Sequence, residues 1–438
     1  MKLIFTCLVF TLFAKNIFCQ NFTPGNLVVF RAGSGAAAIG NIATAIFLDE
    51  YTTTGTLVQT VAMPTMAVGA NKAIFCNGSS TTDGQINLSA DKKFIVLTGY
   101  LTTDGAANPQ AVSSLNAPRV IGTVANDKII NTTTSLDIFS AAAMRSVASP
   151  NGTDFYVVGG STGTILATLG STTTTLISGT ITNSRAIKIF DGDIYISNAS
   201  GTNPRIGKVG TGLPTTTGQV NVGLPGMPTT GSPYSFLMLD VSAAVAGLDV
   251  LYIADDGFGI LKYSLVGGSW VSNGTINAAG VKGLTGSNMG NIVKLYSTDG
   301  AQISTITDNA GYNAPPSSTM PTVIATAAIN TAIRGIAFAP ESTVTGITNT
   351  TINNVFSLKK IGDNINNNEL KLNINTKKSS DGIITIFDVT GRLVFKNKIK
   401  LFIGNNIFNA NIQKYNAGTY ILNVTQLNKK AAVKFFKF

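Results

Sequence analysis

Two short acidic segments hold the residues whose chemistry is easiest to recognise in this sequence. Asp255 and Asp256 follow one another in "YIADDGFG", and Asp191 and Asp193 flank a glycine in "FDGDIYIS". Carboxylate oxygens are preferred ligands of Ca²⁺, so both segments are candidate calcium sites. Neither has the acidic density of a twelve-residue calcium loop, and Asp-Gly pairs are also favoured in tight turns. Asp255 and Asp256 therefore have two interpretations, as calcium ligands or as turn residues, and we expect no other cofactor.

The sequence contains no histidine, which limits the reactions that it could catalyse. Imidazole is the commonest general base, a usual zinc ligand and the central group of most catalytic triads. Cys76 follows the apolar residues "AIF", which favours a buried thiol over a nucleophile. Acid–base catalysis would then depend on carboxylates, Lys, Tyr or Cys76, and a glycosidase would need a pair of carboxylates, for which Asp240, Asp255 and Asp256 are the first candidates. We therefore expect a protein that is not an enzyme, with a carboxylate- or calcium-dependent hydrolase as the alternative.

Three arginines begin segments that are similar to one another. Arg145 begins "RSVASPNGTDFYVVGG", Arg185 begins "RAIKIFDGDIYISNAS" 40 residues later, and Arg334 begins "RGIAFAP". If these segments occupy equivalent places in the fold, the three guanidinium groups lie at one end of it. They could bind an anionic ligand together, or each could bind backbone carbonyls between neighbouring repeats.

The repeats indicate the architecture that positions these arginines. Residues 21–340 are rich in Gly, Thr, Ala, Ser and Val, and apolar residues often alternate with polar ones at the period of a β-strand. Units of 40 to 57 residues with about four short strands are typical of β-propeller blades. The candidate first strands predict an all-β chain with a six-bladed propeller over residues 20–341, and seven blades are the alternative count. A β-sandwich or a β-helix is the competing architecture.

The two ends of this region are complementary. Residues 25–64 contain three strand-like segments, "GNLVVFRAG", "ATAIFLDEYTT" and "GTLVQTVAMP", but no first strand. Residues 334–340 are a first strand with no outer strands after it. We expect the last strand to pair with the first ones, because this pairing closes a ring and removes exposed sheet edges.

Charge divides the chain into two parts. Residues 20–341 carry 15 Lys and Arg against 17 Asp and Glu, whereas residues 342–438 carry 14 against 4. The segment 342–355 is small, polar and uncharged, which predicts a linker. Because the large part is nearly neutral, we do not expect it to bind nucleic acid.

The first residues predict export. Lys2 precedes an apolar stretch from Leu3 to Ala14, which is the layout of a signal peptide over residues 1–19. Cleavage after Cys19 is expected, and lipidation of Cys19 is the alternative. No later apolar stretch is long enough to predict a transmembrane anchor.

Three segments of the large part resemble secreted bacterial propellers of the NHL- and surface-layer-like kind. They are "LDEYTTTGTLVQTVAMP", "TGLPTTTGQVNVGLPGMPTTGSPYSFLMLD" and "LYIADDGFGILKYSL". Such propellers include binding proteins, adhesive surface proteins and some hydrolases, so the resemblance implies a scaffold and does not specify a reaction.

Residues 356–438 resemble the type A C-terminal sorting domain of the bacterial type IX secretion system, also called the Por secretion system. The matching segments are "DVTGRLV", "NAGTYIL" and a lysine-rich last strand; "LKKIGDNINNNELKL" replaces the usual "YPNP"-type opening. The residues that carry the resemblance are Asp388, Gly391, Arg392, Gly418, Tyr420, Lys429, Lys430 and Lys434.

The resemblance implies a small β-sandwich that directs a folded passenger through the periplasm and across the outer membrane. It also implies two partners, the translocon and a sortase-like peptidase, followed by release or attachment to surface lipopolysaccharide. The alternative is an accessory β-sandwich that binds sugar or caps the chain. We therefore expect a secreted or cell-surface protein of the binding or adhesion type, whose propeller binds a polysaccharide or a surface protein.

Overall fold

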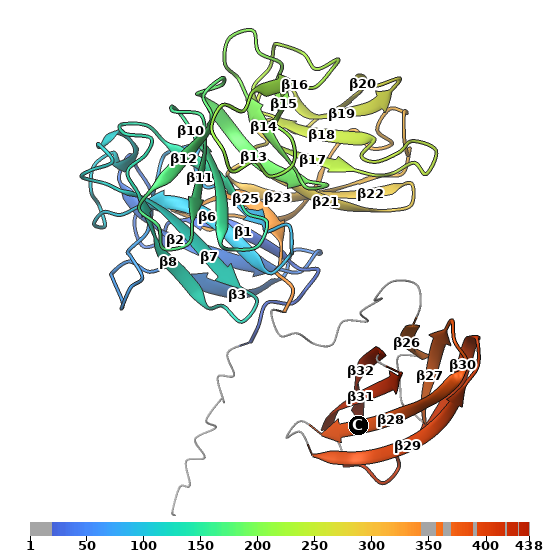
Figure 1. The fold of residues 1–438 in the computed structure, drawn as a ribbon. Coiled ribbons are helices and arrows are strands. Elements are labelled where there is room, and N and C mark those ends of the chain that lie inside the picture. Colours follow the sequence, from blue (N-terminus) through green and yellow to red (C-terminus); the bar gives the residue numbers. More distant parts are fainter. Residues whose placement is uncertain are drawn as a thin grey trace, which may run out of the picture. The chain divides into compact units, whose positions relative to one another are not determined.

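The computed structural model describes residues 20–342, 356–361, 369–388, 392–416, 418–427 and 429–437, and its chain divides into two compact units, residues 1–343 and 344–438. The prediction of an all-β chain is confirmed: within the described residues there are strands and one short 3₁₀ helix, η1 (Pro109–Ala111) (Figure 1). No helix in these residues is long and apolar enough to cross a membrane. The predicted signal peptide, nearly all of the predicted linker and Gly391 lie outside the described residues.

The larger unit contains six groups of four antiparallel strands, and one extra strand, β4 (Phe75–Asn77), pairs with strands of two groups. Each of four groups forms a sheet of its own, and the other two are joined through β4 into a nine-stranded sheet. The groups are given in chain order, each from its first strand to its last. The first group is β5 (Asn87–Leu88), β6 (Phe94–Tyr100), β7 (Arg119–Ala125) and β8 (Ile130–Leu136), and the second is β9 (Met144–Ala148), β10 (Asp154–Gly159), β11 (Thr164–Thr168) and β12 (Thr174–Ser178). The third is β13 (Ser184–Phe190), β14 (Asp193–Asn198), β15 (Ile206–Val209) and β16 (Asn221–Gly223), and the fourth is β17 (Pro233–Leu239), β18 (Val250–Asp255), β19 (Gly259–Val266) and β20 (Ser269–Ile276). The fifth is β21 (Gly283–Met289), β22 (Ile292–Thr298), β23 (Gln302–Asp308) and β24 (Thr322–Thr326), and the sixth is β25 (Ala332–Phe338), β1 (Leu27–Ala32), β2 (Ala43–Tyr51) and β3 (Leu57–Ala62).

The last group joins the two ends of the unit. Strand β25 pairs antiparallel with β1, with Phe338 opposite Leu27 and Ala332 opposite Ala32. The prediction that the last strand pairs with the first ones is therefore confirmed. The six first strands β5, β9, β13, β17, β21 and β25 contact one another in this cyclic order, and β25 contacts β5 again.

Apolar side chains fill the spaces between neighbouring groups. One core cluster combines Leu27 and Val29 of β1 with Tyr296 and Ile303 of the preceding group. Similar clusters lie between the other neighbouring pairs, so each sheet buries residues on both faces. This burial accounts for the Val- and Ile-rich runs in the central strands.

Tight turns connect many of the strands. Asp191 and Gly192 both have positive φ, 48° and 77°, and they join β13 to β14 with Phe190 opposite Asp193. Positive φ at both central residues is the type I′ geometry that favours Asp-Gly. The turn interpretation of this segment is confirmed for Asp191.

The smaller unit has two antiparallel sheets around one core. The first contains β26 (Phe356–Ile361), β27 (Glu369–Thr376) and β30 (Gly404–Asn411), and the second has the order β29 (Leu393–Leu401), β28 (Ser380–Asp388), β31 (Gly418–Gln426) and β32 (Lys429–Lys437). Leu372 and Ile374 of the first sheet share a hydrophobic cluster with Ile384 and Ile386 of the second.

Candidate functional site

Asp255, one of the two candidate calcium ligands, stabilises a turn. It ends β18, and its side chain is buried. Its Oδ2 accepts a hydrogen bond from the Ser232 amide at 2.7 Å, and Oδ1 accepts from the Gly257 and Phe258 amides at 3.0 and 3.1 Å. Both oxygens are thus directed at backbone donors, which favours the turn interpretation.

Asp256 has a different partner. Its Oδ1 lies 2.6 Å from Nζ of Lys282, which precedes β21. Within the described residues, no group of three or more His, Cys, Asp or Glu side chains is placed to hold a metal ion. The positions of Asp255 and Asp256 therefore lend no support to a calcium site.

Cys76 is buried, as the sequence predicts. The residue is 1% exposed, and its thiol donates a hydrogen bond to the Thr44 carbonyl at 3.4 Å. Burial raises the pKa of the Cys76 thiol to about 12. The thiol is therefore neutral at physiological pH, where a nucleophile would need its thiolate form.

The three repeat arginines each contact the next group around the ring. Arg145 donates to Asn183 Oδ1 at 2.5 Å and to the Ser184 carbonyl at 3.0 Å, whereas Arg185 donates to Ser232 Oγ at 2.9 Å. Arg334 pairs with Asp83 and donates to the Asn77 and Gly78 carbonyls at 2.7 and 2.8 Å. The predicted bonds to backbone carbonyls thus exist for Arg145 and Arg334.

The arginines are also close to other cations. The pKa of Arg145 is lowered by burial and, secondarily, by the positive charge of Arg185. The Tyr234 ring lies 4.3 Å from the Arg185 guanidinium and 5.4 Å from Lys282 Nζ. We call Arg145, Arg185, Lys282 and Arg334, together with Tyr234, the basic rim.

The charges of the basic rim are only partly balanced. Arg334 is paired with Asp83 and Lys282 with Asp256. Arg145 and Arg185 form no ion pair within the described residues. Both are half-buried, and a cavity of about 310 Å³ lies beside Lys282 and Arg334. Among the described residues, therefore, no carboxylate within ion-pair distance balances the charges of Arg145 and Arg185.

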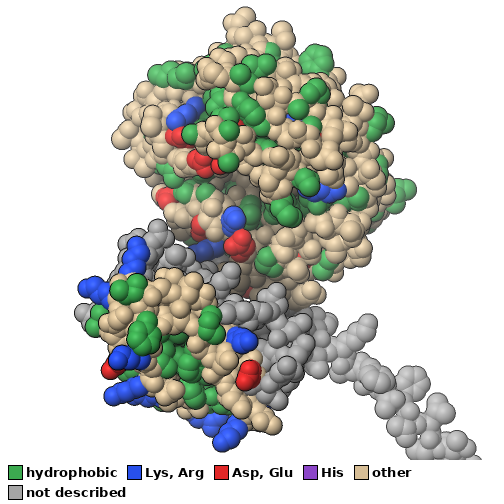
Figure 2. Space-filling model, turned by 90° about the vertical axis from the view of Figure 1, so that its right-hand side faces the viewer, with side chains coloured by type: hydrophobic (Ala, Val, Ile, Leu, Met, Phe, Trp, Pro, Cys, Tyr) green, Lys and Arg blue, Asp and Glu red, His purple; other side chains and the backbone are tan. Residues whose placement is uncertain are grey.

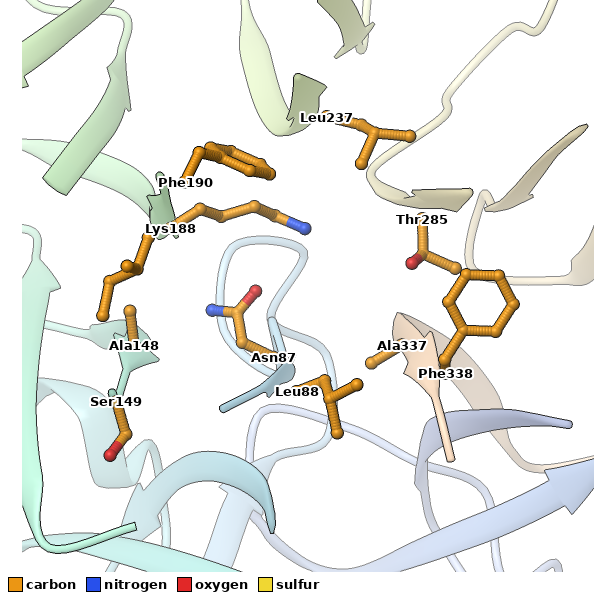
Figure 3. Close-up of a pocket in the computed structure, with 11 residues that line it drawn as sticks. Asn87, Leu88, Ala148, Ser149, Lys188, Phe190, Leu237, Thr285, Ala337 and Phe338 are labelled. Atoms are coloured by element: carbon orange, nitrogen blue, oxygen red, sulfur yellow. The ribbon is translucent and has the colours of Figure 1, made fainter. Parts of the chain in front are cut away.

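A second cavity lies where the six first strands converge (Figure 3). It has a volume of about 140 Å³. One equivalent residue from each first strand lines it, namely Asn87, Ala148, Lys188, Leu237, Thr285 and Ala337. Three of these follow the rim arginines by three positions: Ala148, Lys188 and Ala337.

Lys188 is the exceptional residue of this central cavity. It is half-buried, and its side chain extends into the cavity, where Nζ donates a hydrogen bond to the Leu284 carbonyl at 3.3 Å. Burial lowers the pKa of Lys188 to about 8. Lys188 is not among the residues predicted from the sequence, although comparison of "RAIK" with "RSVA" and "RGIA" shows a lysine where the other repeats have alanine.

Two residues of the smaller unit that carry the sorting resemblance, Asp388 and Arg392, are hydrogen-bonded to each other across a β-hairpin. Asp388 Oδ2 accepts from Arg392 Nε at 3.0 Å, and Asp388 Oδ1 accepts from the Arg392 amide at 3.1 Å. The backbone amide of Asp388 donates to the Arg392 carbonyl at 3.0 Å. These bonds join the end of β28 to the start of β29, so Asp388 and Arg392 stabilise the hairpin.

The second sheet places the other resemblance residues. Gly418 begins β31, and Tyr420 is buried with its hydroxyl donating to the Asn416 carbonyl at 2.9 Å. The Tyr420 ring stacks on Phe435 with centroids 5.5 Å apart. Lys429 and Lys430 of β32 pair through their backbones with β31, and Lys434, also on β32, is exposed.

An additional lysine row lies on the edge strand β29. Lys396, Lys398 and Lys400 alternate along it, and all three are exposed. Lysines on an edge strand discourage pairing with other chains. Figure 2 shows Lys and Arg side chains gathered over the smaller unit, whereas the visible surface of the larger unit is mostly uncharged.

Among known proteins, the sorting resemblance has a direct counterpart. Residues 344–437 match the family model described as the secretion system C-terminal sorting domain. Comparison with curated proteins finds no match.

Two solved structures to which the chain is similar are distant in sequence. A nidogen/laminin complex is 15% identical with a TM-score of 0.38, and the alignment covers 72% of this chain and 99% of that one. PorZ, an essential bacterial surface component of the type-IX secretion system of Porphyromonas gingivalis, is 13% identical with a TM-score of 0.36; 98% of this chain and 60% of PorZ are covered. Neither bears on the NHL- and surface-layer-like resemblance, which stays a prediction.

The family match and the predicted motifs agree on the same C-terminal segment. The smaller unit thus carries a secretion system C-terminal sorting domain, which supports the chain as a type IX secretion substrate destined for the medium or the cell surface.

Proposed function

We propose that residues 20–341 form a six-bladed β-propeller and that residues 356–438 form a small β-sandwich. Six groups of four strands, the cyclic contacts of their first strands and the pairing of β25 with β1 support the propeller. Two sheets around a common core support the sandwich. In this arrangement the first strands surround a central channel, and the basic rim lies at one mouth of it.

The exported propeller, in our proposal, binds a partner and does not catalyse a reaction. The observation that carries this proposal is the pair Arg145 and Arg185, two neighbouring guanidinium groups without an ion pair within the described residues. Guanidinium groups bind carboxylate and sulfate groups through charge-assisted hydrogen bonds. An acidic polysaccharide at the cell surface is the ligand class that fits a secreted protein with such a rim.

The basic rim predicts salt-dependent binding of acidic polysaccharide to the full mature chain. In the double variant Arg145→Gln and Arg185→Gln, affinity for polygalacturonate should fall roughly tenfold or more, because a hydrogen bond to a charged group contributes about 1.5–3 kcal/mol. The measurement is titration calorimetry at two salt concentrations.

The matched control removes two cations elsewhere, exposed Lys93 (Lys93→Gln) and half-buried Lys294 (Lys294→Gln), and should leave the affinity unchanged. Equal losses in both double variants would show a general charge effect and contradict a rim site. Failure of the unaltered protein to bind any acidic polysaccharide would contradict the proposed ligand class.

Asp255 provides a test that separates a turn residue from a catalytic or calcium-binding one. Asp255→Asn places an amide group among three backbone donors, so we expect a loss of about 1–3 kcal/mol in the free energy of unfolding, with or without calcium. Thermal and urea unfolding measure this loss. We also expect no turnover of glycoside, phosphoester or carboxyl-ester substrates. Turnover that is abolished by Asp255→Asn or Asp256→Asn would contradict the binding proposal and favour the hydrolase alternative.

A further inference from the structure

The central cavity has one cation and a mainly apolar wall, whereas the basic rim contains four cations. Lys188 is the only titratable side chain among the residues that line it. Strands β5, β9, β17, β21 and β25 contribute neutral residues, including Leu88, Leu237, Ala337 and Phe338. The charge of Lys188 therefore has no acidic counterpart in the cavity.

The ammonium group of Lys188 is incompletely satisfied. It has three N–H donors, and its hydrogen bond to the Leu284 carbonyl is long, at 3.3 Å. Charged groups removed from water are normally paired, because an unpaired one is costly. The lowered pKa of Lys188, caused by burial, reflects this cost. An anion beside Nζ would remove much of it.

Two polar neighbours restrict where such an anion could bind. The Asn87 amide nitrogen already donates to the Val147 and Ile187 carbonyls, at 2.7 and 2.9 Å, so it is fixed by the backbone. Thr285 lies across the cavity, and Figure 3 shows its hydroxyl and the Lys188 amine both directed into the open space. An anion between these two groups would accept one hydrogen bond from Lys188 Nζ and one from the Thr285 hydroxyl.

The shape and charge of the cavity determine the ligand class. Of the two hydroxyl groups that line the cavity, that of Ser149 is turned away from the open space in Figure 3, so one cation and the Thr285 hydroxyl remain as donors. This set suits a monoanion, whereas phosphate and sulfate dianions need more donors. Leu88, Leu237, Phe190 and Phe338 offer apolar contacts for a hydrocarbon group. The volume of about 140 Å³ equals roughly five waters at about 30 Å³ each, so the ligand has few heavy atoms.

We propose that the central cavity binds a short-chain monocarboxylate, with its carboxylate between Lys188 and Thr285 and its hydrocarbon chain against Leu88, Leu237 and Phe338. This site is separate from the basic rim, and it does not depend on the polysaccharide proposal.

The test uses butyrate as the probe and calorimetry on the full mature chain. Butyrate should bind with a dissociation constant of roughly 1 mM, and Lys188→Met, which keeps side-chain length without charge, should weaken binding roughly tenfold or more. The rim variant Arg145→Gln with Arg185→Gln should bind butyrate as the unaltered protein does. Inorganic phosphate should bind more weakly than butyrate.

A second measurement uses only the unaltered protein, in case Lys188→Met does not fold. Because Lys188 loses its proton as the pH rises through about 8, butyrate affinity should fall across this range, and binding near pH 8 should take up protons. Absence of butyrate binding, equal binding by folded Lys188→Met, preference for phosphate, or an affinity independent of pH between 7 and 9 would each overturn the proposal.

Discussion

Deletion of residues 356–438 is expected to abolish appearance of the protein outside the cell and to leave a folded larger unit in the periplasm. The reason is structural: every described strand from β1 to β25 pairs only within the larger unit, so the deletion removes no strand partner from it. The match to the C-terminal sorting domain, in contrast, covers residues 344–437, most of which the deletion removes. Fractionation of cells that have type IX secretion, with antibody detection in periplasm, surface and medium, measures the result.

A point variant refines this experiment. Tyr420→Ala removes a ring that stacks on Phe435 and a hydroxyl bonded to the Asn416 carbonyl, so it should unfold or loosen the smaller unit and reduce export. Lys93→Gln, on the larger unit, should be exported normally. Export of the truncated protein at the unaltered level would contradict the sorting role of the C-terminal unit.

Gly335→Ala is expected to destabilise the larger unit where β25 contacts β5. Gly335 of β25 lies against the backbone that leads into β5: a Cβ built there would lie 2.4 Å from the Gly84 carbonyl oxygen and 2.4 Å from the Ile86 amide nitrogen. Backbone atoms cannot rotate away as a side chain can. Gly335→Ala must therefore separate β25 from β5, and we expect a loss of about 3 kcal/mol in the free energy of unfolding, at the upper end of the usual range for overpacking.

Gly40→Ala is the matched control, because Gly40 has ordinary φ and no neighbouring atom within 4 Å of the added Cβ. Urea unfolding should show this variant within about 0.5 kcal/mol of the unaltered protein. A Gly335→Ala protein as stable as Gly40→Ala would contradict the close contact between β25 and β5.

The sequence predicted the strand architecture well because its signals are local or repeated. The "FDGD" turn is specified by the backbone needs of Asp191 and Gly192, and the Arg-to-Arg interval identified equivalent first strands. Complementary ends were enough to predict the pairing of β25 with β1. The smaller unit was recognised from motifs whose residues, such as Asp388 and Arg392, close a hairpin.

The sites were predicted less well, because they depend on contacts across the ring. No local pattern tells that Asp256 is bound by Lys282, 26 residues away, or that Arg185 and Lys282 lie over the same Tyr234 ring. Lys188 was missed because in one strand it resembles an exposed lysine. Only the convergence of six strands gives it an apolar environment.

Transfer to another protein tests whether the C-terminal unit is sufficient to direct export. Residues 342–438 are fused to an unrelated folded passenger that carries residues 1–19 at its N-terminus, and the fusion is produced in a bacterium with type IX secretion. We expect the passenger to reach the surface or medium, and to stay in the periplasm when the system is disabled or when Tyr420→Ala is present. A passenger that remains in the periplasm beside a normally exported full-length protein would contradict the claim that the C-terminal unit is sufficient to direct export.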